Sequence, residues 1–599
     1  MTDKSKRNSI RDAWRLAKPY WVSEEKWPAR GLLLAVVALN LGNVYISVRL
    51  NEWNNAFYNA LQKLDSGEFF RQLGVFCLLA AVFIVMAVYA LYLSQMLQIR
   101  WRRWLTRRYL GAWLSDRAYY HLDLKSATDN PDQRISEDLN QFTSYLLTLS
   151  LGLLTSVVSL VSFLFILWGL SGPANIPFGA WGTLHIPAYL VWVALLYAGV
   201  GTWLTIKIGR PLIPLNFDQQ RFEADFRFSL VRLRENAESV ALYRGEAMEL
   251  SVFQERFHNV FENFWQIMKR QKRLAWFTSG YGQIALIFPI VVVAPRYFAK
   301  QIGLGGLMQV VSAFSSVQSS LSFIISSYTN IAAWQAVTDR LSGFEERLSA
   351  IHHSTRETGP LVIRHTESGV AVHGLHLDLP DGTPLLRDVT LAAASGAAVL
   401  ITGPSGAGKS TLLRAIAGLW PYGRGEISLS SGRILFVPQR PYLPLGKLST
   451  ALLYPSGDTN NISTAKLAAV LTQVGLSALV DELDSVHDWT LRLSPGEQQR
   501  FAFARIFLFQ PTLVFLDEAT SALDESSEAH LYGLLRAASW RPTIVSVGHR
   551  STIRSFHDQV VELDASVDNP YQRNGDASLC EPLVELGKVD VSEASRFAL

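Results

Sequence analysis

Six long apolar stretches in the first 335 residues constrain what this chain can fold into more than any other feature. An apolar helix crosses the ~30 Å hydrocarbon core of a bilayer with about 20 residues, and each stretch is long enough to do so. The rest of the 599-residue chain shows short β-like runs and turns instead. We therefore predict a membrane domain of six helices followed by a water-exposed domain. The apolar stretches lie near residues 31–49, 72–96, 146–169, 187–206, 275–296 and 306–330.

Basic residues indicate which side of the membrane each connection occupies. They gather in the N-terminal arm and in two long connections, near 97–145 and 207–274, whereas the loop 170–186 contains neither Lys nor Arg. Because cytoplasmic loops are enriched in Lys and Arg, we expect both termini and the C-terminal domain in the cytoplasm. The two long connections contain little Pro or Gly, so we expect helical extensions of the spans that carry force. Solvated helices with no mechanical role are the alternative.

Charge and cysteine content give no support for a nucleic-acid-binding protein, a disulfide-stabilised fold or a cysteine metal site. The net charge is only +4, from 55 Lys and Arg against 51 Asp and Glu, which gives no indication of a nucleic-acid partner. The two cysteines, Cys77 in an apolar stretch and Cys580 in the polar tail, argue against a disulfide framework or a cysteine metal site.

The sixth apolar stretch carries serines at helical spacing. Small residues in this pattern can permit close packing between helices in lipid. A hydroxyl stripe can also form one wall of a wet central cavity suited to a polar solute, and the two readings are compatible. The stripe consists of Ser312, Ser315, Ser319, Ser322 and Ser326.

A phosphate-binding loop follows a buried-strand pattern at 399–402 and precedes an amphipathic helix. Its glycines allow backbone N–H groups to approach and cradle phosphate, while Lys409 meets the phosphate charge and the Ser410 hydroxyl can ligate Mg²⁺. This strand–loop–helix context rarely occurs by chance, so we predict ATP and Mg²⁺ as cofactors. The ATP-binding residues of the loop are Gly403, Pro404, Ser405, Gly406, Ala407, Gly408, Lys409, Ser410 and Thr411.

A second apolar strand pattern, at 513–516, ends in the carboxylates of Asp517 and Glu518. In a phosphate-loop ATPase, one carboxylate at this position holds Mg²⁺ through water, and a second orients and polarises the attacking water. We assign the first role to Asp517 and the second, catalytic role to Glu518. A strand that merely ends in solvated acids is the alternative, and the phosphate loop upstream makes it the weaker one.

The segment 493–500, Leu-Ser-Pro-Gly-Glu-Gln-Gln-Arg, resembles the signature motif of ABC transporters. Gln439, at the end of a predicted strand, and His549, after a β-like run, occur in the order typical of that family. The resemblance implies that Gln439 senses the γ-phosphate and contributes to the Mg²⁺ site beside Ser410 and Asp517. It also implies that His549 contacts the γ-phosphate. Both residues are therefore counted with Glu518 as catalytic.

The same resemblance implies a dimer. In the ABC family, ATP lies between the phosphate loop of one ATPase domain and the signature motif of another, which assigns Ser494 and Gly496 to ATP binding across that interface. Asp524 would act at the same interface. Each motif occurs once in this chain, so two chains must meet. A homodimer is the economical expectation, and a heterodimer with a similar chain is the alternative.

Three positions depart from the usual ABC pattern. Pro495 stands where a glycine is usual, and Glu497 stands where glutamine is common. Pro495 removes one backbone donor near the phosphate, but Ser494 and the Gly496 N–H remain, so we expect hydrolysis to survive at a modest rate. Leu379 occupies the position where many family members stack an aromatic ring on adenine, so we expect no such stacking.

The cytoplasmic segment 209–246 narrows the resemblance to a subfamily. Its strings Gly-Arg-Pro-Leu-Ile, Glu-Ala-Asp-Phe-Arg and Arg-Leu-Arg-Glu-Asn-Ala-Glu are similar to BacA/SbmA-related transporters of bacteria in their ATPase-fused, BacA-like form. The segment also resembles peroxisomal acyl-CoA half transporters. The first resemblance implies an exporter-type architecture in the bacterial inner membrane and uptake of bulky polar solutes, including antimicrobial peptides and corrinoids. An exporter, a lipid or acyl-CoA translocator, and a proton-driven carrier regulated by its ATPase domain are the alternatives.

The expected fold class is thus a membrane α-helical domain of exporter type fused to an α/β phosphate-loop ATPase domain. No function is assigned to the C-terminal tail. The predicted parts are an N-terminal arm (1–30), a transmembrane domain (31–335), a linker (336–360), an ATPase domain (361–565) and the tail (566–599).

Overall fold

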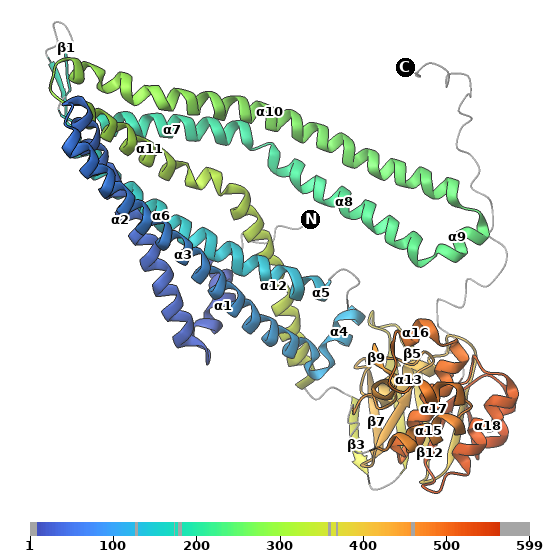
Figure 1. Cartoon of the computed structure of the whole chain (residues 1–599). Coiled ribbons are helices and arrows are strands. Elements are labelled where there is room, and N and C mark those ends of the chain that lie inside the picture. The colour runs from blue at the N-terminus through green and yellow to red at the C-terminus, as the bar shows by residue number, and fades with distance from the viewer. Residues whose placement is uncertain are drawn as a thin grey trace, which may run out of the picture. The chain divides into compact units, whose positions relative to one another are not determined.

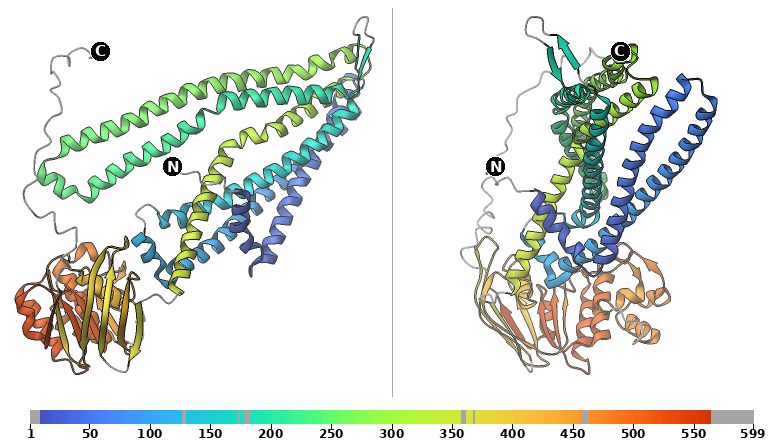
Figure 2. Two further views of the ribbon diagram at one scale, coloured as in Figure 1. Left: turned by 180° about the vertical axis from the view of Figure 1, so that it is seen from behind. Right: turned by 90° about the vertical axis from the view of Figure 1, so that its left-hand side faces the viewer.

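The computed structural model describes residues 9–125, 130–172, 174–177, 183–356, 361–366, 369–456 and 462–563. The chain forms two compact units, which we call the helical unit (Met1–Ser115 with Thr128–Ser349) and the α/β unit (Asp116–Ala127 with Ala350–Leu599). Figures 1 and 2 show the elements of each. The predicted tail, 566–599, lies outside the described residues.

Among the described residues, six helices are long and apolar enough to cross a membrane, which confirms the six predicted spans. Most of each apolar window is not buried within the chain, as expected of helices that contact lipid. The last of them is followed, after Ser327, by α12 (Tyr328–Arg356), so the predicted linker 336–360 is helical as far as Arg356. The six are α2 (Lys26–Gln62), α3 (Ser66–Leu114), α6 (Leu139–Leu170), α7 (Tyr189–Gly209), α10 (Glu246–Phe298) and α11 (Leu304–Ser326).

Several helices continue beyond their apolar windows as charged extensions. The 53 residues of α10 make it about 80 Å long at ~1.5 Å per residue, more than twice the hydrocarbon thickness. Beside it run α7 and α8 (Leu212–Glu235), and α9 (Ala237–Tyr243) closes the hairpin (Figure 1). Smaller elements are α1 (Ser9–Trp21), η1 (Ser115–Arg117), α4 (Ala118–Lys125), α5 (Pro131–Gln133), the π-turn η2 (Arg134–Asp138), β1 (Ala174–Pro177) and β2 (Thr183–Ile186).

A buried carboxylate joins α12 to the start of α6. Asp138, only 1% exposed, accepts hydrogen bonds from Arg340 Nε at 2.9 Å and Arg340 Nη2 at 2.7 Å. Arg134 Nη1 adds a third bond at 2.8 Å. A buried charge is tolerated only when it is paired and hydrogen-bonded, and both conditions are met here. The charged part of α12 is therefore packed into the helical unit.

Amide side chains join α2 to α11 along a polar seam. Asn51 Nδ2 donates to the Gln309 carbonyl at 2.9 Å, and Asn55 Nδ2 donates to Gln309 Oε1 at 2.7 Å. At the start of α11, the Gly305 N–H donates to Asn59 Oδ1 at 3.0 Å, which satisfies one of the free N–H groups of that helix end. Polar groups inside a membrane bundle join helices because hydrocarbon offers them no partner.

Two tyrosines join α7 to α10. The hydroxyl of Tyr197 donates to the Tyr281 carbonyl at 2.8 Å, and the hydroxyl of Tyr281 donates to the Tyr197 carbonyl at 3.0 Å. Their rings stack with centroids 4.5 Å apart. Gly201 makes room for this pair, because a Cβ added there would lie 2.2 Å from Tyr281 Cζ.

The α/β unit contains two principal sheets. Its strands are β3 (Leu361–Thr366), β4 (Val370–Asp378), β5 (Pro384–Ala393), β6 (Ala398–Thr402), β7 (Gly423–Ser430), β8 (Ile434–Val437), β9 (Gly446–Lys447), β10 (Val486–His487), β11 (Leu513–Asp517), β12 (Thr543–Val547) and β13 (Gln559–Glu562). Five of them form a parallel sheet in the order β13-β6-β12-β11-β8, and four form a mixed sheet in the order β3-β7-β4-β5. The third group, β9 with β10, is a short antiparallel pair.

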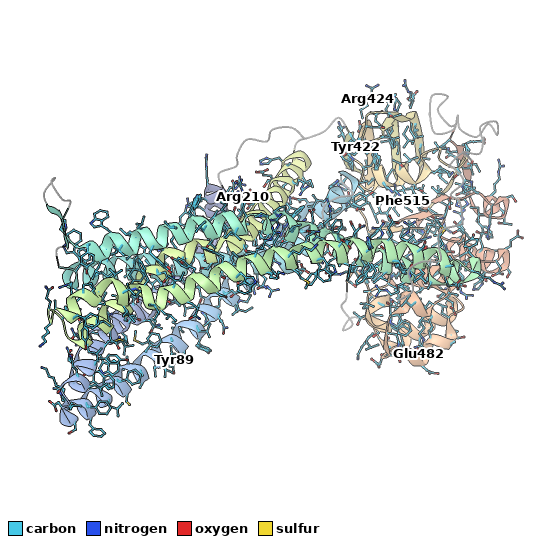
Figure 3. All side chains as sticks on the ribbon, turned by 90° about the horizontal axis from the view of Figure 1, so that it is seen from above. Tyr89, Arg210, Tyr422, Arg424, Glu482 and Phe515 are labelled. Atoms are coloured by element: carbon cyan, nitrogen blue, oxygen red, sulfur yellow. The ribbon has the colours of Figure 1, made fainter. Side chains whose placement is uncertain are left out.

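The parallel sheet forms the core of this unit. Strands β6, β11 and β12 are buried along nearly their whole length, which is why the sequence shows them as continuous apolar runs. Phe515 on β11, labelled in Figure 3, stacks on Phe436 of β8 with ring centroids 4.4 Å apart. Helices of the unit are α13 (Lys409–Ile416), α14 (Leu448–Leu452), α15 (Thr464–Gln473), η4 (Ser477–Glu482), α16 (Trp489–Arg492), α17 (Pro495–Phe509), α18 (Glu525–Arg536) and η5 (Ser551–Phe556).

We predict that Gly201→Val lowers the thermal stability of the purified protein. The new side chain overlaps the Tyr281 ring, and such overpacking costs about 1–3 kcal/mol. Gly199→Val is the matched control, since a Cβ there meets no atom within 4 Å. Thermal unfolding in detergent followed by tryptophan fluorescence measures both variants, and equal melting temperatures would contradict the assigned role of Gly201.

Candidate functional site

The predicted phosphate loop lies between β6 and α13. Gly403, Gly406 and Gly408 have φ angles of 145°, 82° and 86°, a region that glycine adopts without steric penalty. Gly408 is the N-cap of α13, and no side chain caps this helix end. The first N–H groups of α13, together with the positive end of the helix dipole, therefore favour an anion.

Lys409, the first residue of α13, folds back over the loop. Its ammonium donates to the carbonyls of Gly403 at 2.9 Å and Pro404 at 2.7 Å. Burial lowers the pKa of Lys409, and the negative charges of Glu518 and Asp517 oppose that effect. The ammonium is thus held at the mouth of the loop, where a phosphate oxygen of ATP can take the place of these carbonyls as its partner.

Two of the three predicted Mg²⁺ ligands, Ser410 and Asp517, meet at the end of β11. Ser410 Oγ donates to Asp517 Oδ1 at 2.9 Å, a spacing that suits neighbouring ligands around an octahedral ion with oxygens at about 2.1 Å. Burial raises the pKa of Asp517, and the bond from Ser410 opposes the rise. Among the described residues, no group of three or more His, Cys, Asp or Glu could hold a metal. That fits Mg²⁺, which takes further ligands from phosphates and water, and whose bound charge would neutralise the phosphates.

The three predicted catalytic residues converge. Gln439 Nε2 donates to Glu518 Oε2 at 2.8 Å, and His549 Nε2 lies 3.2 Å from Glu518 Oε1. The backbone of Glu518 has a φ of 47°, and its N–H donates to the carbonyl of Val547 on β12 at 3.1 Å. The neighbouring strand therefore holds a conformation that non-glycine residues rarely adopt. A carboxylate fixed in this way can orient a water molecule and accept its proton.

Gln499 on α17 was not singled out from the sequence, although it lies at the centre of the site. It is 3% exposed, and its Nε2 lies 3.1 Å from Ser521 Oγ and 3.3 Å from the Gln439 carbonyl. Its Oε1 accepts from the Ala522 N–H at 2.9 Å. One amide thus connects the signature helix with Gln439 and with the turn that follows Glu518.

The turn at 521–524 is also held by Arg550, which follows His549. Arg550 Nη1 donates to the Leu523 carbonyl at 2.7 Å, and Nη2 donates to the Ser521 carbonyl at 3.0 Å. Asp524 is the N-cap of α18, where its carboxylate accepts from the Ser527 N–H at 3.2 Å. Hydrogen bonds from Ser526 and Ser527 hold the pKa of Asp524 well below its usual range. The predicted role of Asp524 across a dimer interface stays a prediction.

The departures in the signature motif have a structural explanation. Ser494 is the N-cap of α17 and Pro495 is the first helical residue, where a missing N–H costs nothing. Glu497 completes a capping box, accepting from the Ser494 N–H at 2.9 Å and the Ser494 hydroxyl at 2.7 Å. These bonds lower the pKa of Glu497. Among the described residues, no hydrogen bond joins Ser494 or Gly496 to the phosphate loop of the same chain.

Helix α4, from the connection between the second and third spans, belongs to the α/β unit. Arg117 Nη1 donates to the Ala417 carbonyl, just after α13, at 2.8 Å, and Leu124 packs against the core of the unit. Tyr120 lines a cavity of 390 Å³ together with Ser410, Gln439 and Asp517. A residue from the membrane-domain sequence therefore lies beside the predicted metal ligands, which the sequence alone did not reveal.

Two family models match the chain: ABC transporter transmembrane region 2 at residues 16–298, and ABC transporter at residues 386–521. The Arabidopsis thaliana protein named ABC transporter D family member 2, chloroplastic, is 36% identical over 94% of this chain and 87% of its own length. The chain belongs to the ABC transporter family. It is a half transporter, with one transmembrane part and one ATPase part, and it is related to the D family.

Other relatives of the half transporter span nearly its whole length. The Escherichia coli inner membrane ABC transporter ATP-binding protein YddA is 34% identical over 92% of this chain and 97% of its own. The human lysosomal cobalamin transporter ABCD4 is 26% identical over 91% and 92%, respectively. A solved structure of a bacterial Atm1-family ABC exporter with ATP bound matches with a TM-score of 0.70 at 17% identity, over 90% of this chain and 94% of that one. The predicted exporter-type fold is thereby confirmed.

We predict that Gln499→Leu lowers the kcat of ATP hydrolysis about tenfold, as expected if ~1.4 kcal/mol of positioning is lost, while nucleotide affinity changes less than twofold. The substitution keeps the side-chain size and removes the bonds to Ser521 and Ala522. Gln498→Leu is the control, because its amide donates to the Thr490 and Leu493 carbonyls instead. Steady-state kinetics and nucleotide titration separate the two effects; an equal loss of affinity would mean that Gln499 only supports the fold.

Proposed function

We propose that this ABC half transporter works as a homodimer in the bacterial inner membrane and takes up bulky hydrophilic solutes, peptides among them, at the expense of ATP. Family membership and fold establish ATP-driven transport across a membrane. The observation that carries the finer proposal is the polar face of α11. The solute class and the homodimer are inferred from the considerations that follow, and the direction from the resemblance of segment 209–246 to BacA/SbmA-related transporters.

The polar face of α11 points away from the packed core of the helical unit. Ser315, Ser319 and Ser326 are exposed, whereas Ala313 and Phe314 are buried among apolar side chains of neighbouring helices. Water offers exposed hydroxyls partners that hydrocarbon does not, although a hydroxyl can also bond within its own helix, as Ser326 Oγ does to the Phe323 carbonyl at 3.0 Å. A water-filled cavity that accepts a polar solute accounts for their position.

The names of the relatives support a bulky polar solute. The human relative is named a cobalamin transporter, and cobalamin is a corrinoid, one of the cargo classes implied by the BacA/SbmA-like strings in segment 209–246. The Escherichia coli relative is named an inner membrane protein, which supports the same location here. The resemblance of segment 209–246 to peroxisomal acyl-CoA half transporters makes a lipid or acyl-CoA the competing candidate cargo.

The single copy of each ATPase motif supports a dimer, and a homodimer is its simplest form. Ser494 and Gly496 have no hydrogen bond to the phosphate loop of their own chain among the described residues, which is compatible with the ABC-type arrangement in which a second chain brings its signature motif to the nucleotide. With both chains in place, Lys409 and α13 bind the phosphates, and Glu518 orients water for attack on the γ-phosphate. Gln439 and His549, which contact Glu518, respond to the presence of that phosphate.

Transport assays in sealed membrane vesicles test the proposal. Right-side-out and inside-out vesicles receive a labelled peptide, a corrinoid or an acyl-CoA, with and without ATP on the cytoplasmic side. Uptake is supported when ATP drives peptide or corrinoid toward the cytoplasmic face. ATP-driven movement of acyl-CoA alone, or movement in the opposite direction, would contradict it.

The Glu518→Gln variant tests the mechanism. We expect hydrolysis to slow by about a hundredfold or more, because a water-positioning carboxylate contributes ~10²–10⁴-fold, while ATP binding persists. Transport should stop with hydrolysis. Transport that survives in this variant but is abolished by a proton uncoupler would instead establish a proton-driven carrier.

Glu497→Gln tests the placement of the signature motif. Gln keeps an oxygen that accepts the Ser494 N–H, but it removes a negative charge next to the proposed site of the partner's phosphates. We expect the KM for ATP to fall about two- to threefold, the effect of roughly 0.5 kcal/mol of repulsion in a high-dielectric site. Asp484→Asn, which removes an exposed acid paired with Lys447, is the control. An unchanged KM in Glu497→Gln would place this helix away from the nucleotide.

A further inference from the structure

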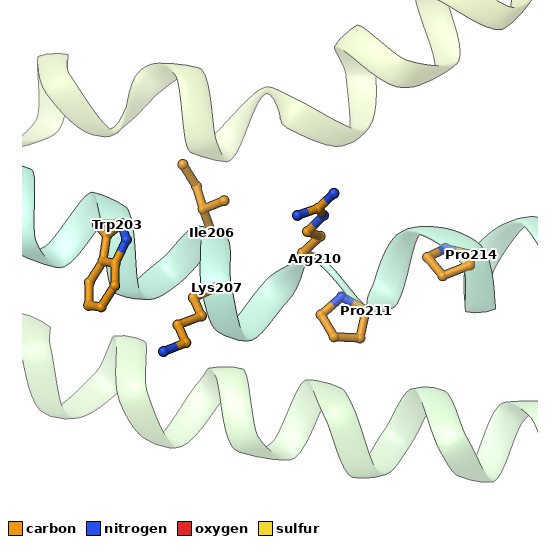
Figure 4. A pocket seen from close by; sticks show the side chains of 6 residues that line it. All are labelled: Trp203, Ile206, Lys207, Arg210, Pro211 and Pro214. Atoms are coloured by element: carbon orange, nitrogen blue, oxygen red, sulfur yellow. The ribbon is translucent and has the colours of Figure 1, made fainter.

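A cavity of 680 Å³ lies at the bend between α7 and α8 in the helical unit. Pro211 has no N–H to donate to the Lys207 carbonyl, so the regular helix ends at Gly209 and a new one begins at Leu212. Figure 4 shows the side chains at this bend. The cavity is lined by Trp203, Ile206, Lys207, Arg210, Pro211 and Pro214.

The polar part of this cavity is positively charged. Lys207 Nζ lies 5.1 Å from the centre of the Trp203 ring, a cation–π contact that leaves its N–H groups available to a ligand. The Arg210 guanidinium has no hydrogen-bond or ion-pair partner in the part of the chain that the structure describes. Pro211 is the N-cap of α8, and no side chain caps that 24-residue helix, so its first N–H groups add a partial positive charge.

The apolar part of the cavity is formed by residues of the membrane-spanning helix α7. Trp203 and Ile206 are 60% and 46% exposed, and both precede Lys207 on the apolar part of α7. Tryptophan is enriched where hydrocarbon meets headgroups, so we infer that Lys207 and Arg210, which follow Trp203 toward the charged end of the helix, lie near the headgroups. Cationic groups next to an open apolar wall match a ligand that carries an anion and a hydrocarbon chain.

We propose that this cavity binds an anionic phospholipid of the cytoplasmic leaflet. Its phosphate lies near the start of α8, where Lys207 and Arg210 extend to different sides of the helix (Figure 4) and both contribute positive charge, and its acyl chain lies along Trp203 and Ile206. Inorganic phosphate would use the charges but not the apolar wall, and a zwitterionic lipid would bring a cationic group next to Lys207 and Arg210. The bend joins a membrane span to the long charged hairpin of α8 and α10, so an occupied cavity would stabilise one angle between them.

Native mass spectrometry of the full-length transporter in detergent tests the proposal. Delipidated protein is titrated with phosphatidylglycerol and, separately, with phosphatidylcholine of the same chains. We expect tighter binding of phosphatidylglycerol, and we expect Lys207→Gln/Arg210→Gln to weaken it about thirtyfold, which corresponds to about 2 kcal/mol for two basic side chains at an anionic lipid. Phosphatidylcholine binding should not change.

Lys272→Gln/Arg273→Gln is the matched control. These exposed residues of α10 carry the same charge and adjoin Leu274, whose side chain would lie 3.8 Å from a Cβ on Gly209, so they lie at the same depth outside the cavity. We expect wild-type phosphatidylglycerol binding in this control. Equal weakening in both double variants would show a general surface charge effect and overturn the proposal.

The Trp203→Ala variant and inorganic phosphate distinguish a lipid from a free anion. We expect Trp203→Ala to weaken phosphatidylglycerol binding, and millimolar inorganic phosphate to leave the lipid bound. Phosphate that displaces the lipid, together with lipid binding unaffected by Trp203→Ala, would identify a simple anion site instead. Thermal unfolding checks that each variant is folded; unchanged lipid binding in folded Lys207→Gln/Arg210→Gln protein would also refute the assignment.

Discussion

Hydrocarbon offers the peptide backbone no hydrogen-bond partner, and the architecture of the helical unit depends on this constraint. Each of the six spans is a helix because a helix satisfies its own backbone groups. The polar side chains that remain within the unit must find partners in neighbouring helices. Asn51 and Asn55 meet Gln309, and Tyr197 and Tyr281 exchange bonds with each other's carbonyls. Ser315 and Ser319 of α11 are exposed instead, whereas Ser326 bonds to the Phe323 carbonyl of its own helix, so the first two carry the weight in proposing a wet cavity.

In the α/β unit, the chemistry depends on strand order. Strands β6, β12 and β11 are parallel neighbours, so the residues that follow them meet at one edge of the sheet. The phosphate loop follows β6, Glu518 follows β11 and His549 comes shortly after β12. The strand order alone thus brings together three segments that are far apart in the sequence. Gln499 and Arg550 then fix the turn after Glu518 by bonds to its backbone and side chains.

The sequence predicts the parts of the site that consist of short contiguous motifs. The phosphate loop, Asp517 and Glu518 are short strings in a recognisable strand context, and the order of Gln439 and His549 assigned them to the same site. The motif pattern does not distinguish Gln499 from Gln498. Only the tertiary structure shows that the Gln499 amide, and not that of Gln498, bonds to Ala522. The linker predicted over 336–360 is helical as far as Arg356, and the sequence did not reveal that Asp138, some 200 residues earlier, pairs with Arg340 in this stretch. Tyr120 was missed because the fold carries α4 into the other unit.

The membership of α4 in the α/β unit has a consequence for how the two halves of such a transporter can be divided. The chain crosses from the helical unit into the α/β unit and back before the ATPase sequence has begun. An ATPase fragment starting at Ala350 would lack the side chain of Leu124 on its core and the Arg117 bond to Ala417. During synthesis, α4 therefore lacks its packing partners until more than 250 further residues have been added to the chain. The α/β unit thus includes a segment that is synthesised long before the rest of that unit.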